Sequence, residues 1–200
     1  MNIKSVIQEA MQWYNMEISA GELESTPDET DILESQIDSL RPPEGQKMKI
    51  NFDGAAGPKG FACGAVARDC NARFKGCQNK ILIHCKAVET VGNGALLAVE
   101  MARRKGFKEI IVEGDSLIVI NALKYAHYKP DWRLQNIINK IREELQHFKP
   151  VEFRYIKKTA NDVAHNVAAL AVKNHSSNEW TTSPTSCIAQ LIESEYSPTL

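Results

Sequence analysis

The chain of 200 residues has no long apolar run, no closely spaced cysteine pair and almost no net charge. No stretch approaches roughly 18 consecutive apolar residues, so neither a transmembrane helix nor a membrane partner is expected. The first residues lack the apolar core of a secretory signal, which favours a nuclear or cytoplasmic protein over a secreted one. The five cysteines are odd in number and include no CxxC pair, so reduced thiols are expected rather than disulfides or a zinc site.

The formal net charge of −1 averages two unlike parts of the chain. Residues 47–175 contain 22 Lys or Arg against 12 Asp or Glu, a balance of +10, whereas the flanks contain 2 against 13, a balance of −11. A central part with this balance favours an anionic partner such as nucleic acid. The alternative is an ordinary solvated surface on which the lysines are spread evenly.

Composition and periodicity divide the chain into three parts. Residues 1–46 combine an N-terminal helical pattern over 1–19 with an acidic, proline-interrupted linker over 20–46. Residues 47–175 are ordered and long enough for one hydrophobic core. Residues 176–200 form a short C-terminal tail with one possible helix over 188–194.

The hydrophobic period of the central part predicts the order βββαβααβα, an α/β fold with a mixed five-stranded sheet flanked by helices. Strands are expected over 48–56, 61–69, 73–85, 108–114 and 151–156. The first helix has a face of small residues that includes Val91, Ala95, Ala98 and Ala102, with Gly106 as its C-cap. The second begins with Asp115 as its N-cap, the third spans 132–148, and Asn161 caps the last.

Three segments carry a family resemblance: INFDGA, ALLAVEMARRKGFKEIIVEGDS and FRYIKKTANDVAHNVAALA, in this order between about residues 49 and 172. They resemble the ribonuclease H type 1 fold, and more closely the plant reverse-transcriptase-like, retrotransposon-derived branch of that family. The resemblance implies a hydrolase that cleaves the RNA strand of an RNA–DNA hybrid. It also implies four carboxylates that hold two magnesium ions.

Two of the four carboxylates that the resemblance implies are present in the chain. Asp53 matches the first and Asp115 the third, although alone they would also suit a turn residue and a helix N-cap. The second position falls on Val91, and the nearest carboxylate, Glu89, lies roughly 200° around the helix from it. The fourth position is His165, where the hydrolytic enzymes carry Asp; its alternative role is an inert residue at a helix edge. Neutral imidazole suits Mn²⁺ or Zn²⁺ better than Mg²⁺.

Two further carboxylates are candidate metal ligands. Glu113 shares a strand face with Asp115, and Asp162 lies three residues before His165 on a neighbouring helix face. Losing one ligand carboxylate weakens both metal affinity and metal positioning. We therefore expect weak or no nuclease activity, with Mg²⁺ or Mn²⁺ required for any that survives.

Nucleic-acid binding is expected separately from hydrolysis. The partner that the resemblance implies is an RNA–DNA hybrid or double-stranded RNA, whose A-form shapes are alike. A favourable charge cluster at a helix C-terminus also explains part of the basic sequence. The alternative function is a non-enzymatic protein-interaction module on the same scaffold. Candidate phosphate contacts are Arg103, Arg104 and Lys105 at the end of the first helix, and Lys157, Lys158 and Asn161 at and after the end of the last strand.

Overall fold

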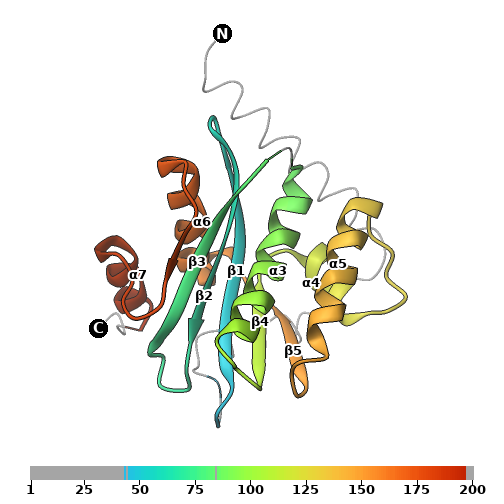
Figure 1. Ribbon diagram of the computed structural model, residues 1–200, viewed down its shortest axis with the longest axis horizontal. Helices are drawn as coiled ribbons and strands as arrows, with labels where there is room; N and C mark the ends of the chain where they lie inside the picture. Colours follow the sequence, from blue (N-terminus) through green and yellow to red (C-terminus); the bar gives the residue numbers. More distant parts are fainter. Residues whose placement is uncertain (1–42, 44, 84, 197–200) are drawn as a thin grey trace. The chain divides into compact units, whose positions relative to one another are not determined.

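The computed structural model describes residues 43, 45–83 and 85–196, so the expected helix over 1–19 and nearly all of the acidic linker lie outside the described residues. The described part contains one mixed sheet with the strand order β5-β4-β1-β2-β3-β6 (Figure 1). β1 pairs with β4 in parallel and with β2 in antiparallel orientation. The strands are β1 Met48–Gly57, β2 Gly60–Arg68, β3 Phe74–Leu82, β4 Ile110–Gly114, β5 Val151–Tyr155 and β6 Asn178–Trp180.

Helices cover both faces of this sheet (Figure 1). Ile50 and Phe52 of β1 pack into the larger core with α3, α4 and α5, whereas Ala55 packs with α6 on the other face. No helix of the described residues is long and apolar enough to cross a membrane. The helices are α3 Ala87–Arg104, α4 Leu117–Lys124, α5 Trp132–Leu145, α6 Asp162–Asn174 and α7 Ser186–Tyr196, with a 3₁₀ turn η1 over Lys158–Ala160.

The predicted α/β sheet with flanking helices is confirmed, but its strand number is wrong, because the C-terminal tail adds a sixth strand. β6 pairs with the middle of β3, with Trp180 opposite Cys77. Three residues are too few to show a period in the sequence. α7 follows β6, and its Ile188 is buried in a second core cluster with Val66 of β2. The described part of the tail, residues 176–196, therefore packs onto the sheet through β6 and α7.

The predicted N-cap at Asp115 is also wrong. Ser116 caps α4, where its hydroxyl accepts a hydrogen bond from the backbone N–H of Val119 (3.4 Å). α3 ends at the C-cap Lys105, and Gly106 follows it with a left-handed φ of +72°. This is the position after the cap, where glycine is favoured because it lacks a Cβ atom. The third predicted helix ends at Leu145, three residues earlier than expected.

Glycine allows α3 to lie directly against the backbone of β1. A Cβ atom added to Gly94 would lie 2.7 Å from the carbonyl oxygen of Asp53. A Cβ atom on Gly54 would lie 2.9 Å from the backbone nitrogen of Val91. The first turns of α3 are therefore fixed in place beside the strand that carries Asp53.

Candidate functional site

Parallel pairing of β1 and β4 brings Asp53 and Asp115 together. Asn51 of β1 lies opposite Glu113 of β4. Asp53 comes two residues after Asn51, and Asp115 comes two residues after Glu113. Because alternate residues share a face of a strand, Asp53 lies on the same face as Asn51, toward α6. The Asp53 residue is only 5% exposed. The site thus lies where β4 and its parallel pairing with β1 end, and the carboxyl end of a parallel strand is a usual position for function in such sheets.

The start of α6 completes this site with an imidazole and an amide. The Nδ1 atom of His165 lies 2.8 Å from Oδ2 of Asp53. The buried side chain of Asn161 donates from Nδ2 to the carbonyl oxygen of Phe52 (2.9 Å) and to Oδ1 of Asp115 (3.3 Å). Asn161 is the N-cap residue of α6 as predicted, but its side chain makes no capping hydrogen bond. It joins the helix to both strands instead.

The environment of Asp115 favours its neutral form. Burial and the negative charge of Asp53 raise the pKa of Asp115 from 3.8 to about 6. The hydrogen bond from Asn161 and the positive charge of Lys158 act in the opposite direction but are smaller. The two carboxylates therefore share one site in which holding both negative charges is costly.

His165 has the reverse tendency. Its hydrogen bond with Asp53 raises the pKa of the imidazole above the usual 6.5, and the charge of Asp53 adds to this effect. Burial and Lys158 oppose it. The His165 side chain is 43% exposed, so its outer edge faces solvent while Nδ1 faces the carboxylate. The site therefore favours a cationic group beside Asp53.

Val91, which the resemblance assigns to the position of the second carboxylate, is an apolar side chain in the core. Val91 lies in the first turns of α3, is 6% exposed and belongs to the main core. Glu89 does not replace it, because its carboxylate accepts a hydrogen bond from the backbone N–H of Lys86 (2.9 Å) and so caps the helix. α3 is also too close to β1 to rotate freely.

These residues do not fit the two-ion arrangement that the resemblance implies. Asp53, Asp115 and His165 meet, but one of the three presents a ring nitrogen to a carboxylate. Within residues 43, 45–83 and 85–196, no three His, Cys, Asp or Glu side chains form a group that could hold a metal ion. Mg²⁺ needs several converging oxygen ligands, and Val91 removes one of them.

The two further candidate ligands lie apart from this pair. Glu113 is fully buried, with its carboxylate 3.3 Å from Nζ of Lys49 and accepting from the amide of Asn51 (3.1 Å). Asp162 is exposed in the first turn of α6. Neither contacts Asp53 or Asp115 among the interactions described.

A buried polar row that the sequence did not reveal adjoins the site on the α6 face. Arg68 of β2 donates to Asn51 (3.1 Å), and Asn51 donates to Glu113, which pairs with Lys49. Burial raises the pKa of Glu113 and lowers that of Lys49, and it outweighs their mutual attraction. The continuous apolar pattern over 61–67 of the neighbouring strand was the available signal that both faces are covered.

The predicted basic cluster at the C-terminal end of α3 takes part in local ion pairs. Arg103 pairs with Glu144 of α5 (2.8 Å), and Arg104 approaches Glu179 of β6 (3.8 Å). Lys105 is the C-cap residue of α3. These contacts connect α3 to its neighbours, as a helix C-terminal charge cluster would.

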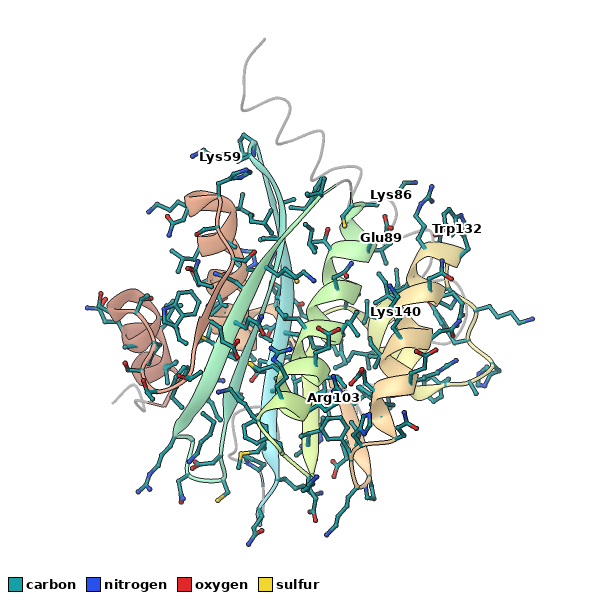
Figure 2. The ribbon with its side chains drawn as sticks, viewed as in Figure 1. Lys59, Lys86, Glu89, Arg103, Trp132 and Lys140 are labelled. Carbon is teal, nitrogen blue, oxygen red and sulfur yellow. The ribbon has the colours of Figure 1, made fainter. Side chains whose placement is uncertain are left out.

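This cluster lies far from the carboxylate pair. Figure 2 shows Glu89 and Arg103 at opposite ends of α3. Arg103 comes twelve positions after Val91 in the helix, about 18 Å at the standard rise. Lys157 and Lys158, by contrast, are exposed directly after β5, and the charge of Lys158 acts on both Asp115 and His165. Only the second predicted group of cations therefore lies beside the site.

A family model described as reverse transcriptase-like matches residues 51–171, more than half of the chain and a span that includes every site residue above. The chain belongs to the reverse transcriptase-like family. No curated protein matches the sequence of this chain.

Solved structures show that this reverse transcriptase-like domain has the ribonuclease H fold. RNase H1 from the halophilic archaeon Halobacterium salinarum is 20% identical, with a TM-score of 0.59 over 65% of this chain and 99% of that one. The N-terminal RNase H domain of a Mycobacterium tuberculosis protein is 16% identical, with a TM-score of 0.60 over 65% and 96%. The RNase H1 designated LC11, solved in complex with an RNA/DNA hybrid, is 18% identical, with a TM-score of 0.57 over 64% and 98%.

Proposed function

We propose that this reverse transcriptase-like domain binds nucleic acid of A-form shape, an RNA–DNA hybrid or double-stranded RNA, and hydrolyses it weakly or not at all. The observation that carries the proposal is Val91, buried in the core at the position of a ligand carboxylate. The domain has the fold, the aspartate pair and the adjacent lysines, whereas its set of metal-ligand carboxylates is incomplete. Any residual hydrolysis would require Mg²⁺ or Mn²⁺ and Asp53.

Charge supports nucleic acid as the partner. The matched segment lies within the part of the chain that has a balance of +10. Phosphate contacts by Lys and Arg supply most non-specific nucleic-acid affinity. LC11 RNase H1, which shares the fold, was solved with an RNA/DNA hybrid, and this supports a hybrid as the first probe to test. His165 at the fourth position further supports assignment to the plant, retrotransposon-derived branch.

A salt titration tests the binding part of the proposal. Fluorescence anisotropy would compare labelled RNA–DNA hybrid, double-stranded RNA, double-stranded DNA and single-stranded RNA at increasing salt. We expect the two A-form probes to bind most tightly, with affinity falling steeply as salt rises. The absence of binding to every probe at low salt would reject the proposal and favour the protein-interaction module.

A cleavage assay tests the catalytic part. The wild-type chain and Asp53→Asn would be incubated with hybrid in Mg²⁺ and, separately, in Mn²⁺. We expect little or no cleavage by either protein. Efficient cleavage by the wild type that Asp53→Asn abolishes would contradict the proposal.

A further inference from the structure

Protein groups already contact three of the four oxygen atoms of the carboxylate pair. Oδ1 of Asp53 accepts from the backbone N–H of Gly54 (2.6 Å), and Oδ2 faces Nδ1 of His165 (2.8 Å). Oδ1 of Asp115 accepts from the amide of Asn161 (3.3 Å). The pair is therefore held by donors from β1 and from the start of α6.

The contact between His165 and Asp53 fixes what the imidazole presents to the pair. An ionised carboxylate can only accept hydrogen bonds, so when Asp53 is ionised the hydrogen of this 2.8 Å contact lies on Nδ1. The lone pair of a neutral ring then belongs to Nε2, on the other side of the ring. His165 thus directs a donor at Asp53, whereas a metal ligand would have to direct a lone pair into the site.

The α3 side of the site offers no compensating ligand. Val91 is buried, and Glu89 is held by the backbone of Lys86. The close contact of Gly94 with the backbone of Asp53 restricts any rotation of α3 that would bring another side chain inward.

We propose that His165 takes the place of the divalent cation: its N–H group stabilises Asp53 directly, and the aspartate pair does not take up Mg²⁺ or Mn²⁺. Binding of nucleic acid then needs no metal ion. The first statement, that His165 replaces the cation and the aspartate pair takes up no metal ion, concerns this chain alone and is tested without any nucleic-acid probe. The second statement, that nucleic-acid binding needs no metal ion, rests on the proposed function.

Titration with Mn²⁺ tests the first statement, with electron paramagnetic resonance reporting the free ion. The wild-type chain should show no saturable site at millimolar Mn²⁺. The double variant Val91→Glu with His165→Asp, which restores both carboxylates, should bind at least about tenfold more tightly. Adding Asp53→Asn to the double variant should remove this gain. Asp162→Asn, an exposed carboxylate on the same helix, is the matched control and should change nothing.

Two results would overturn the proposal. One is a saturable Mn²⁺ site in the wild type that Asp53→Asn removes. The other is a folded double variant that binds Mn²⁺ no better than the wild type, because the imidazole would then not be what excludes the ion. Circular dichroism checks folding, and His165→Asp alone, with the same expected gain in direction, replaces the double variant if the latter unfolds.

The second statement needs only one comparison. Affinity for the hybrid probe should agree within about twofold in Mg²⁺ and in EDTA at matched ionic strength. Affinity that is lost in EDTA and recovered with Mg²⁺ would overturn it. If no probe binds in either buffer, the proposed function fails, while the Mn²⁺ titration still decides the role of His165.

Discussion

Asp115 links the site to the pH dependence of folding. Its pKa is about 6 in the folded chain against 3.8 as the ordinary value, so the folded state holds the proton more tightly. Between these two pH values the folded state binds more protons than the unfolded state, and stability therefore falls as pH rises. The effect is at most about 3 kcal/mol and smaller for a partly exposed group.

Asp115→Asn should remove this titration. We expect the variant to be more stable than the wild type by about 1–2 kcal/mol at pH 8 and nearly equal to it at pH 4, because the wild-type carboxyl is then neutral. Urea denaturation at a series of pH values measures this difference. Asp162→Asn is the control with an exposed carboxyl, and an identical pH profile for the two variants would contradict the prediction.

The resemblance predicted which site residues meet, but not how they interact. Asp53, Asp115 and His165 could be named from the sequence because the resemblance assigns each of them a site position. The role of Asn161 as a donor to Asp115 could not, because it depends on the angle at which α6 meets β1 and β4. Arg68 was missed for a similar reason, since strand pairing alone brings it to Asn51.

At the scale of secondary-structure elements, the contact of α3 with β1 should make two nearby glycines respond differently to substitution. Inside a helix, alanine is more favourable than glycine by about 1 kcal/mol of folding free energy. At Gly94 the new Cβ atom meets the backbone of Asp53, which can move only with the strand, so Gly94→Ala should destabilise by about 1–3 kcal/mol. At Gly92 it meets the end of the Leu134 side chain, which can rotate.

We therefore expect Gly92→Ala to be neutral or slightly stabilising. Thermal unfolding of the two variants beside the wild type is the measurement. Equal destabilisation by both substitutions would mean that α3 does not depend on this close approach.

The C-terminal tail should contribute to stability through α7. Ile188 is 1% exposed and packs with Val66 and Cys77. Truncating it leaves a cavity, so Ile188→Ala should cost about 2–4 kcal/mol of unfolding free energy. Gln190→Ala, on the exposed side of the same helix, should change stability by less than about 0.5 kcal/mol. Chemical denaturation compares the two, and a small effect of both would show that the tail is dispensable.

Long periodic elements were predictable from the sequence, and short or paired ones were not. The apolar faces of α5 and α6 are several turns long, so the hydrophobic period of the sequence was enough to predict these two helices. β6 has three residues and forms only because β3 offers an edge for pairing. The N-cap of α4 is Ser116 and not the predicted Asp115, because the Asp115 side chain faces Asn161 and Asp53.

At the scale of the whole molecule, the position of the cations matters more than their number. Lys157→Ala with Lys158→Ala should lower affinity for the hybrid probe about tenfold and reduce the salt slope by about 1–2, because these lysines are exposed beside the site. Arg103→Ala with Arg104→Ala should change both far less, since that cluster pairs with Glu144 and Glu179 at the other end of α3.

Salt-dependent anisotropy on both double variants measures this contrast, with folding of each confirmed first. A larger loss in the arginine variant would place the binding surface at the opposite end of α3. The charge balance of the sequence predicted an anionic partner, but it could not locate the contact surface. That location depends on where the fold places the basic residues relative to the aspartate pair.

The central position of β1 has a consequence for the kinetics of opening. β1 is paired with β2 over Lys49–Gly57 and with β4 over Met48–Asn51, and it is covered on both faces, so the amide hydrogens of its doubly paired part should exchange only when the whole domain unfolds. Asp53 follows this part directly and is thus carried by a buried strand rather than by a loop. A ligand that reaches this strand meets a preorganised surface, and its association loses little entropy in ordering the protein.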